Sequence, residues 1–284
     1  MRLIVISGRS GSGKTTALRA LEDAGYNCID NFPVVLLQSL VHDALRDPEQ
    51  QSAHIAVCID ARSRALDRFA EIMLSLDRMN VDCQVIYLDA QSPTLVKRFS
   101  ETRRRHPLTS ATTDLLEAIE AERDLLESIA DLADLTIDTT LLRGRELAEL
   151  IRERVVGAKR NGLSLLFRSF GFKFGVPVDA DLVFDLRCLP NPYWVPELNR
   201  LTGRDAPVIR FLEENPMARE MFDDLCGFLE RWLPRFENDQ RTYLTVAIGC
   251  TGGQHRSVYM VEKLATRFRG RFADVLVRHR ELEG

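Results

Sequence analysis

Short apolar runs alternate with longer amphipathic segments along the first half of the chain. The runs are rich in valine and isoleucine and lie at residues 3–6, 53–59, 85–88 and 135–137. Between them, apolar residues recur at helical spacing, as in residues 17–24 and 147–155. Continuous apolar strands are typical of parallel strands that helices cover on both faces. The pattern therefore predicts an α/β fold with a parallel sheet between two layers of helices.

The second half of the chain repeats this mixture with less regular spacing. Strands are predicted at residues 163–167, 182–186, 243–248 and 273–277, and helices at residues 217–232 and 257–268. Between the halves, a helical pattern ends in the small and polar residues 156–162 before a new apolar run begins. We therefore expect an N-terminal domain over residues 1–157 and a second, smaller α/β domain over residues 162–284.

The composition is that of a globular protein and excludes several other classes. Of the 284 residues, 45% are hydrophobic and 28% are charged, with a formal net charge of −4. These values exclude a disordered chain and a generally basic surface for nucleic acid. No apolar run approaches the roughly 20 residues that cross a bilayer, and no two of the six cysteines form a C-x-x-C pair. We expect a cytoplasmic protein with reduced thiols and no membrane partner.

A segment near the N-terminus carries a complete phosphate-binding motif. Residues 8–15 read GRSGSGKT, which fits G-x-x-x-x-G-K-[ST] between a predicted strand and a predicted helix. In such a loop, glycines let backbone N–H groups surround a phosphate, the lysine bridges the terminal phosphates, and the hydroxyl binds Mg²⁺. The predicted nucleotide-binding residues are Gly8, Arg9, Ser10, Gly11, Ser12, Gly13, Lys14 and Thr15, with Thr15 as the metal ligand.

A P-loop fold also requires a carboxylate at the end of a neighbouring strand, which holds the magnesium ion through water. Three aspartates close predicted strands: Asp30, Asp60 and Asp89. Each is equally well explained as the N-cap of the helix that follows. We favour Asp60, which follows the apolar run at residues 55–59.

An arginine cluster, Arg103, Arg104 and Arg105, precedes His106 and Pro107 at the end of a helical segment. Mononucleotide kinases carry a mobile lid in this place, whose arginines neutralise charge on the transferred phosphoryl group. A solvated basic helix end explains each single arginine equally well. Three arginines in a row beside a P-loop domain favour the lid.

A second glycine-rich loop follows the predicted strand at residues 243–248. Residues 249–257 read GCTGGQHRS and lead into a predicted helix, which again makes a cradle for an anion. The spacing of Cys250 and Arg256 is also that of cysteine phosphatases, but Cys58 and Arg64 share it. We favour phosphate binding without chemistry, and a purely structural turn is the alternative. The predicted ligand residues of this loop are Cys250, Thr251, Gly252, Gly253, His255 and Arg256.

Two residues outside this loop are candidate contacts to the remainder of a phosphorylated ligand. They are Asp181 and Asn191, chosen because a carboxylate suits an ammonium group. Either residue is also explained as part of a turn or a cap.

A basic stretch near the C-terminus is a candidate RNA contact. Between residues 263 and 280, the only acidic residue is Asp274. A solvated helix face is the alternative explanation. The candidate RNA-binding residues are Lys263, Arg267, Arg269, Arg271, Arg278 and Arg280.

Several blocks of sequence, taken together, resemble the RapZ-type RNase adapter proteins, also described as P-loop nucleotide-binding proteins of the YvcJ type. Besides the two glycine-rich loops, these blocks are residues 30–33 (DNFP), 102–108 (TRRRHPL), 169–173 (SFGFK), 179–181 (DAD) and 189–192 (LPNP). They run from one end of the chain to the other, so the resemblance is far more specific than a P-loop alone.

The resemblance implies a cytoplasmic protein that binds ATP through residues 8–15. It also implies an adapter that binds a small regulatory RNA and presents it to an endoribonuclease, which lowers glucosamine-6-phosphate synthesis. The C-terminal domain of such proteins senses that sugar phosphate and contributes RNA binding, and the protein is a homotetramer. A GTP-binding segment of the family maps to Asp60, Ala61, Arg62 and Ser63.

This chain departs from the family pattern at two places. Relatives carry asparagine at the position of Ser63, and their basic C-terminal tail is replaced here by Arg280, Glu281, Leu282, Glu283 and Gly284.

Two other functions remain open from the residues alone. A small-molecule kinase would use the P-loop and the arginine lid, although the first half shows no clear acceptor site beyond Asp30. A cysteine phosphatase would depend on Cys250. We expect any nucleotide hydrolysis to be slow, so that the protein is at most a slow ATPase or GTPase.

Overall fold

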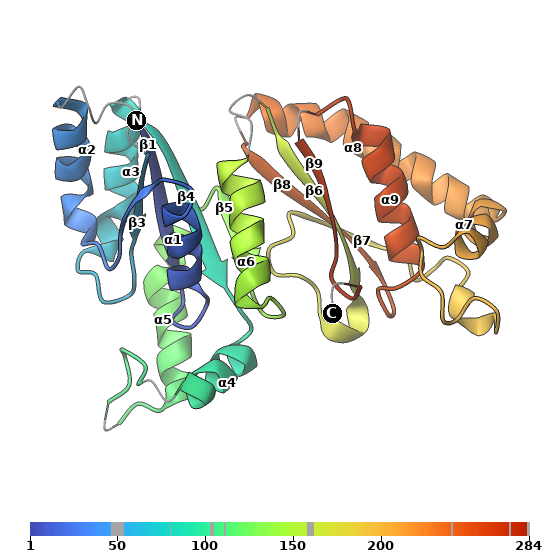
Figure 1. Cartoon of the computed structure of the whole chain (residues 1–284), viewed down its shortest axis with the longest axis horizontal. Helices are drawn as coiled ribbons and strands as arrows, with labels where there is room; N and C mark the ends of the chain where they lie inside the picture. The colour runs from blue at the N-terminus through green and yellow to red at the C-terminus, as the bar shows by residue number, and fades with distance from the viewer. Residues whose placement is uncertain are drawn as a thin grey trace. The chain divides into compact units, whose positions relative to one another are not determined.

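The computed structural model describes residues 1–46, 54–79, 81–102, 105–110, 112–157, 162–239, 241–272 and 274–282. The chain divides into two compact units, Met1–Gly157 and Ala158–Gly284, each with its own parallel sheet (Figure 1). The first unit contains β1 (Arg2–Gly8), α1 (Lys14–Glu22), β2 (Asn27–Ile29), α2 (Leu37–Arg46), β3 (His54–Cys58), α3 (Phe69–Arg78), β4 (Asp82–Asp89), α4 (Ser92–Thr102), α5 (Leu115–Ala130), β5 (Leu135–Asp138) and α6 (Gly144–Ile151). The second contains β6 (Ser164–Gly171), β7 (Leu182–Asp185), α7 (Ala206–Glu213), α8 (Pro216–Asn238), β8 (Tyr243–Cys250), α9 (Arg256–Phe268) and β9 (Asp274–His279).

The first sheet has the strand order β2-β3-β1-β4-β5, and all its strand pairs are parallel. Leu3 and Val5 of β1 face a core that α2, α3 and α5 complete. Because side chains alternate along a strand, Ile4 and Ile6 point to the opposite face, where α1 and α6 pack together. The predicted parallel sheet with helices on both faces is confirmed.

Local sequence explains where several of these helices begin and end. Asp114 and Glu117 form a capping box at the start of α5, in which each side chain accepts a backbone N–H of the other residue. The helix predicted over residues 147–155 begins earlier, at Gly144, and its last turn is a π-helix over Arg152–Val156. Short 3₁₀ helices occupy Val34–Leu36, Leu66–Arg68, Phe172–Phe174 and Pro192–Trp194.

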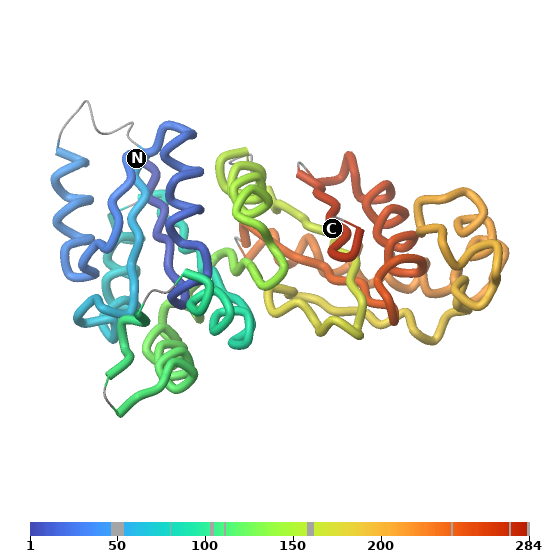
Figure 2. Tube along the Cα trace, turned by 60° about the horizontal axis from the view of Figure 1, so that its bottom comes forward, coloured from blue at the N-terminus to red at the C-terminus, as the bar shows by residue number. Residues whose placement is uncertain are grey.

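The second sheet has the order β7-β8-β6-β9 and is also parallel. Phe167 of β6 and Val246 of β8 belong to a buried core that α7, α8 and α9 complete. Figure 2 shows α9, in red, running alongside this sheet. The predicted second α/β unit is therefore confirmed as a fold. No helix within the described ranges is long and apolar enough to cross a membrane.

Candidate functional site

The phosphate loop leaves the carboxyl end of β1, the central strand of the first sheet. Gly8 has a φ of 140°, and a Cβ there would lie 1.9 Å from the carbonyl oxygen of Leu88. Gly13 has a φ of 104° and directly precedes Lys14, the first residue of α1. A Cβ on Gly13 would lie 2.6 Å from the side chain of Leu147. Two glycines of the motif are therefore required by the close approach of neighbouring elements.

Polar groups of the loop are available for a nucleotide. Lys14 Nζ donates to the carbonyl oxygens of Gly8, at 2.6 Å, and Arg9, at 3.2 Å, so the ammonium lies back over the loop. The Thr15 side chain is exposed on the first turn of α1. The buried hydroxyl of Ser12 has no hydrogen-bond partner within the described part of the chain. This donor set fits phosphates with a magnesium ion.

Two residues of the motif are used for structure instead. The Arg9 side chain is 1% exposed and pairs with Asp89 at 2.7 Å. Ser10 donates to the Glu122 carboxylate from both its backbone N–H and its hydroxyl, each at 2.7 Å. These donors therefore already have acceptors within the fold, which for Arg9 also include Ser92 Oγ and the carbonyl oxygen of Ala90, and contact of either residue with a nucleotide stays a prediction.

Three residues that sequence reasoning missed hold the loop from outside. Arg98 Nη1 donates to the carbonyl oxygen of Gly11 at 2.9 Å, and Thr139 Oγ1 donates to that of Ser12 at 2.9 Å. Glu122 accepts from the N–H and the hydroxyl of Ser10. These partners lie 87, 127 and 112 residues from the groups they hold. A lone polar residue so far along the chain carries no local signal.

The candidate magnesium carboxylates differ in how firmly they are held. Asp60 follows β3 and accepts from Arg62 Nε at 2.9 Å and Nη2 at 2.5 Å, while Asp89 ends β4 and pairs with Arg9. Both strands flank β1. The Arg62 side chain is 56% exposed, whereas that of Arg9 is 1% exposed. Asp30 is exposed at the end of β2, one strand further from the loop.

The segment that the family resemblance connects with GTP forms a tight turn. The Ser63 N–H donates to the carbonyl oxygen of Asp60 at 3.0 Å. Ser63 Oγ accepts from the N–H of Val34 at 3.0 Å. Ala61 is half-buried in this turn. These residues cluster near the end of β3, and their role in binding a nucleotide stays a prediction.

The arginine segment is described only in part, because Arg103 and Arg104 lie outside the described residues. Arg105 is exposed and donates to the Thr109 hydroxyl at 3.2 Å and to its carbonyl oxygen at 3.1 Å. The next residue, His106, is 2% exposed, and its Nε2 lies 3.0 Å from the Glu122 carboxylate. The segment is thus anchored to the same glutamate as the phosphate loop.

The second glycine-rich loop joins β8 to α9 at the carboxyl edge of the second sheet. Gly253 has a φ of 73°, and a Cβ there would lie 2.3 Å from a carboxylate oxygen of Glu281. Cys250 is 2% exposed; its Sγ accepts from the N–H of Gly253 and lies 3.2 Å from the Ser257 hydroxyl. The thiol is therefore enclosed by the loop.

The Arg256 guanidinium has two different edges. The side chain lies in the interior, 3% exposed, and Nη1 donates to the carbonyl oxygens of Leu189 at 2.9 Å and Arg187 at 3.1 Å. Nη2 lies 3.3 Å from the Thr251 hydroxyl of the loop. Nε has no partner within the described residues. Nε and Nη2 form one edge of the planar fork, and Nε is the donor on that edge for which an oxyanion would supply the missing acceptor.

Two of the predicted ligand residues have partners within the fold. His255 Nε2 lies 3.2 Å from the carbonyl oxygen of Leu198, and burial lowers the pKa of this imidazole. It therefore anchors a neighbouring segment rather than a ligand. Asp181 precedes β7, accepts from the N–H of Thr245 at 2.7 Å, and pairs with Arg241. Because β7 and β8 are parallel, Asp181 lies about 16 Å along the strand from the loop after Cys250, so the structure does not bring it together with that loop.

Asn191 lies at the same edge of the sheet as the loop but has a local role. Its Oδ1 accepts from the N–H of Tyr193 at 3.3 Å and caps the 3₁₀ helix Pro192–Trp194. Contact with a sugar stays a prediction for this residue.

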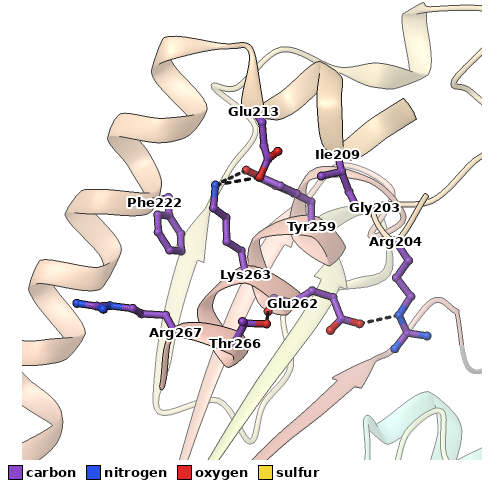
Figure 3. A pocket seen from close by; sticks show the side chains of 10 residues that line it. All are labelled: Gly203, Arg204, Ile209, Glu213, Phe222, Tyr259, Glu262, Lys263, Thr266 and Arg267. Carbon is purple, nitrogen blue, oxygen red and sulfur yellow. Dashed lines mark hydrogen bonds and ion pairs between the residues drawn. The ribbon is translucent and has the colours of Figure 1, made fainter. Parts of the chain in front are cut away.

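Most cations of the basic stretch have acidic partners. Figure 3 shows Lys263 pointing towards Glu213 and Tyr259 in a pocket that α7, α8 and α9 line. The Lys263 Nζ lies 3.4 Å from the Glu213 carboxylate. Arg267 and Arg271 each lie 2.7 Å from Glu230 of α8, and these two arginines lower the pKa of the shared carboxyl group. The sequence alone did not show this compensation.

The remaining cations lie elsewhere in the fold. Arg269 is the C-cap of α9, and Arg278 is a half-buried residue of β9. The Arg280 side chain is 12% exposed and donates to the carbonyl oxygens of Gly171 and Gly175 and to Glu281. The donors of Arg280 are thus used inside the fold, and its contact with RNA phosphates stays a prediction.

Comparison with known proteins places the chain in a family. Residues 1–159 match the RapZ-like N-terminal domain, and residues 163–283 match the RapZ C-terminal domain. A nucleotide-binding protein of Hahella chejuensis is 52% identical, covering 99% of each chain. A nucleotide-binding protein of Pseudomonas putida is 54% identical over 99% of this chain and 100% of its own.

Among solved structures, a shikimate kinase from Acinetobacter baumannii in complex with shikimate aligns with 57% of this chain and 96% of its own, at 20% identity and a TM-score of 0.38. The two family matches together cover nearly the whole chain, and the relatives match it from end to end. The resemblance seen in the sequence blocks is confirmed: the chain belongs to the RapZ family.

Proposed function

We propose that the protein is a nucleotide-binding regulatory adapter. Residues 1–157 form the domain that binds ATP or GTP with Mg²⁺, and residues 162–284 form the domain that senses glucosamine-6-phosphate and binds RNA. The protein binds a small regulatory RNA, presents it to an endoribonuclease, and acts as a cytoplasmic homotetramer. The RNA, the endoribonuclease, the sugar and the assembly rest on the family resemblance.

The phosphate loop supports the nucleotide assignment. Lys14 lies over the loop, the Thr15 hydroxyl is exposed beside it, and the Ser12 hydroxyl is unpaired within the described residues. The related proteins of Hahella and Pseudomonas carry the name nucleotide-binding protein. Asp60 is the preferred carboxylate for water-mediated magnesium binding, because its partner Arg62 is exposed.

One observation carries the proposed sugar-phosphate site: the unpaired Nε of the buried Arg256 guanidinium beside the glycine-rich loop. A buried donor without an acceptor costs about 1 to 3 kcal/mol, and a charged donor costs more. A phosphate oxygen that accepts from Nε would remove this cost. The loop at the start of α9 adds the positive end of the helix dipole. The identity of the sugar comes from the family, since a phosphate cradle does not distinguish one ring from another.

Calorimetry on the full chain tests both ligand sites. Titration with ATP and with glucosamine-6-phosphate should each show saturable binding, while free glucosamine should show none. Equal or undetectable binding of the two sugars would remove the sensor assignment. Crosslinking of the tagged protein in cells, followed by sequencing of bound RNA, tests the adapter role.

A small-molecule kinase is the second candidate function. The phosphate loop is an element that P-loop phosphoryl-transfer enzymes use, and the segment that carries Arg105 is anchored beside it through His106 and Glu122. A screen of sugars and nucleosides for rapid phosphate transfer from ATP distinguishes the two. Rapid transfer, in the range of about 1 to 100 per second typical of kinases, would favour the kinase.

A further inference from the structure

A buried carboxylate stands directly behind the phosphate loop. Glu122 of α5 is fully buried, and its two oxygens accept three hydrogen bonds. Oε2 accepts from the N–H of Ser10 at 2.7 Å and lies 3.0 Å from His106 Nε2, while Oε1 accepts from the Ser10 hydroxyl at 2.7 Å. One side chain therefore joins the loop to the segment of residues 105–110.

The protonation pattern of this contact follows from its geometry. The N–H of Leu108 donates to His106 Nδ1 at 3.2 Å, so Nδ1 must carry a lone pair. Nε2 then carries the ring proton and donates a hydrogen bond to the Glu122 carboxylate.

This carboxylate is held by hydrogen bonds alone. Within the described residues, no lysine or arginine lies at ion-pair distance from Glu122, and His106 is its only basic partner there. Three donors aimed at its two oxygens satisfy the buried carboxyl group. Replacing Glu122 alone by an apolar side chain would leave these three donors without their acceptor, which destabilises the fold for each buried group left unpaired. Glu122 therefore both stabilises this part of the fold and fixes the position of the loop.

The loop residues around Ser10 are held in the same manner. Arg9 is fixed by Asp89, and the carbonyl oxygen of Gly11 accepts from Arg98. The Phe99 ring of α4 lies 5.1 Å, centroid to centroid, from the ring of His106. A Cβ on Gly11 would lie 3.4 Å from the Phe99 ring. Glu122 completes this frame, because it fixes the peptide unit between Arg9 and Ser10.

We propose that Glu122 is the positioning residue of the phosphate loop and that His106 couples the loop to residues 105–110. This inference rests on the proposed nucleotide binding. Glu122 touches no phosphate; it turns the N–H of Ser10 outward, which sets the direction of the following N–H groups towards the ligand. Binding of nucleotide and the position of the Arg105 segment then depend on the same carboxylate.

Calorimetric ATP affinity of full-length variants tests the positioning role. Glu122→Ala removes the acceptor and should weaken ATP binding about tenfold. Glu122→Gln keeps an acceptor for the Ser10 N–H and should stay within about threefold of the unchanged chain. Glu127→Ala, an exposed glutamate on the same helix, should change nothing. Thermal unfolding of each variant separates loss of fold from loss of affinity.

The outcomes distinguish this inference from the proposed function. Full ATP affinity, or tighter binding, in a folded Glu122→Ala variant would overturn the positioning role alone. Absence of ATP binding by the unchanged chain would overturn the proposed function, and the role with it. If Glu122→Ala does not fold, Ser10→Ala tests the link from the loop side; a loss of about threefold is expected, and an unchanged affinity would overturn the role.

A double-mutant cycle tests the coupling through His106. His106→Ala should weaken ATP binding by itself, but by little in a chain that already carries Glu122→Ala, since both changes break one connection. Additive losses would show that His106 acts independently and would overturn the coupling.

Discussion

Arg256 and Leu189 are joined by a hydrogen bond of 2.9 Å from the guanidinium Nη1 to the backbone carbonyl oxygen. The first residue of α9 thereby holds the segment that follows β7, while the other edge of the same guanidinium faces the glycine-rich loop. A residue that sequence reasoning assigned to ligand binding alone also supports the fold.

Replacement of Arg256 should therefore affect both binding and stability. Arg256→Ala should abolish glucosamine-6-phosphate binding in calorimetry. It should also lower the midpoint of thermal unfolding, because unpaired buried carbonyl groups cost about 1 to 3 kcal/mol each. Cys250→Ser is the matched control in the same loop, and it should keep the ligand affinity because the hydroxyl can replace the thiol in its contact with Ser257. A loss of binding with Cys250→Ser would instead support a chemical role for the thiol.

Lys14→Ala should weaken ATP binding at least tenfold. The ammonium contributes a charge-assisted contact worth roughly 1.5 to 3 kcal/mol to the terminal phosphates. Arg19→Ala removes a cation from the exposed face of α1 and should leave the affinity unchanged. Unchanged nucleotide affinity in a folded Lys14→Ala variant, measured by calorimetry, would contradict the assignment of the loop.

Asp60→Asn should remove the magnesium-dependent part of ATP binding. The affinity of this variant with Mg²⁺ should fall towards the value that the unchanged chain shows with a chelator. Asp30→Asn, at the end of the next strand outward, is the control and should behave like the unchanged chain. If Asp60→Asn retains its full magnesium dependence and Asp89→Asn loses it, the magnesium carboxylate is Asp89.

Glu230→Gln should strengthen RNA binding. Arg267 and Arg271 both pair with this carboxylate, so its neutralisation frees two cations for phosphates. The slope of log affinity against log salt should steepen by up to about two counterions. The same substitution in a chain carrying Arg267→Ala and Arg271→Ala should have no effect. A Glu230→Gln slope equal to that of the unchanged chain would place RNA binding elsewhere.

Stability of the second unit should fall at acidic pH through His255. Burial lowers the pKa of this imidazole from its ordinary 6.5. Below pH 6.5 the unfolded chain therefore binds more protons at His255 than the folded chain does. The stabilisation is present above pH 6.5 and is lost as the pH falls towards the lower folded value, by at most about 1.4 kcal/mol per pH unit.

Tryptophan fluorescence during urea unfolding measures this effect selectively, because the two tryptophans, Trp194 and Trp232, both lie in the second unit. His255→Gln should reduce the pH dependence between pH 7 and 5. An identical dependence in the variant and the unchanged chain would rule out His255 as the titrating group.

The local patterns of the chain were sufficient for the α/β class, the main strands and the two glycine-rich loops. Each of these features depends on residues close together in sequence: a continuous apolar run makes a buried strand, and Gly8, Gly13 and Gly253 supply the backbone angles of a turn. The blocks that carry the RapZ resemblance are local for the same reason.

Only the tertiary structure decided which polar groups remain available to a ligand. Ser10 is committed to Glu122, Arg280 to carbonyl groups at the end of β6, and Asp181 to the opposite edge of the sheet from the loop it was expected to serve. Hydrogen bonds between residues about a hundred positions apart depend on strand order and helix packing. The local sequence around either residue of such a pair carries no signal of its partner. These hydrogen bonds could therefore be identified only in the folded structure.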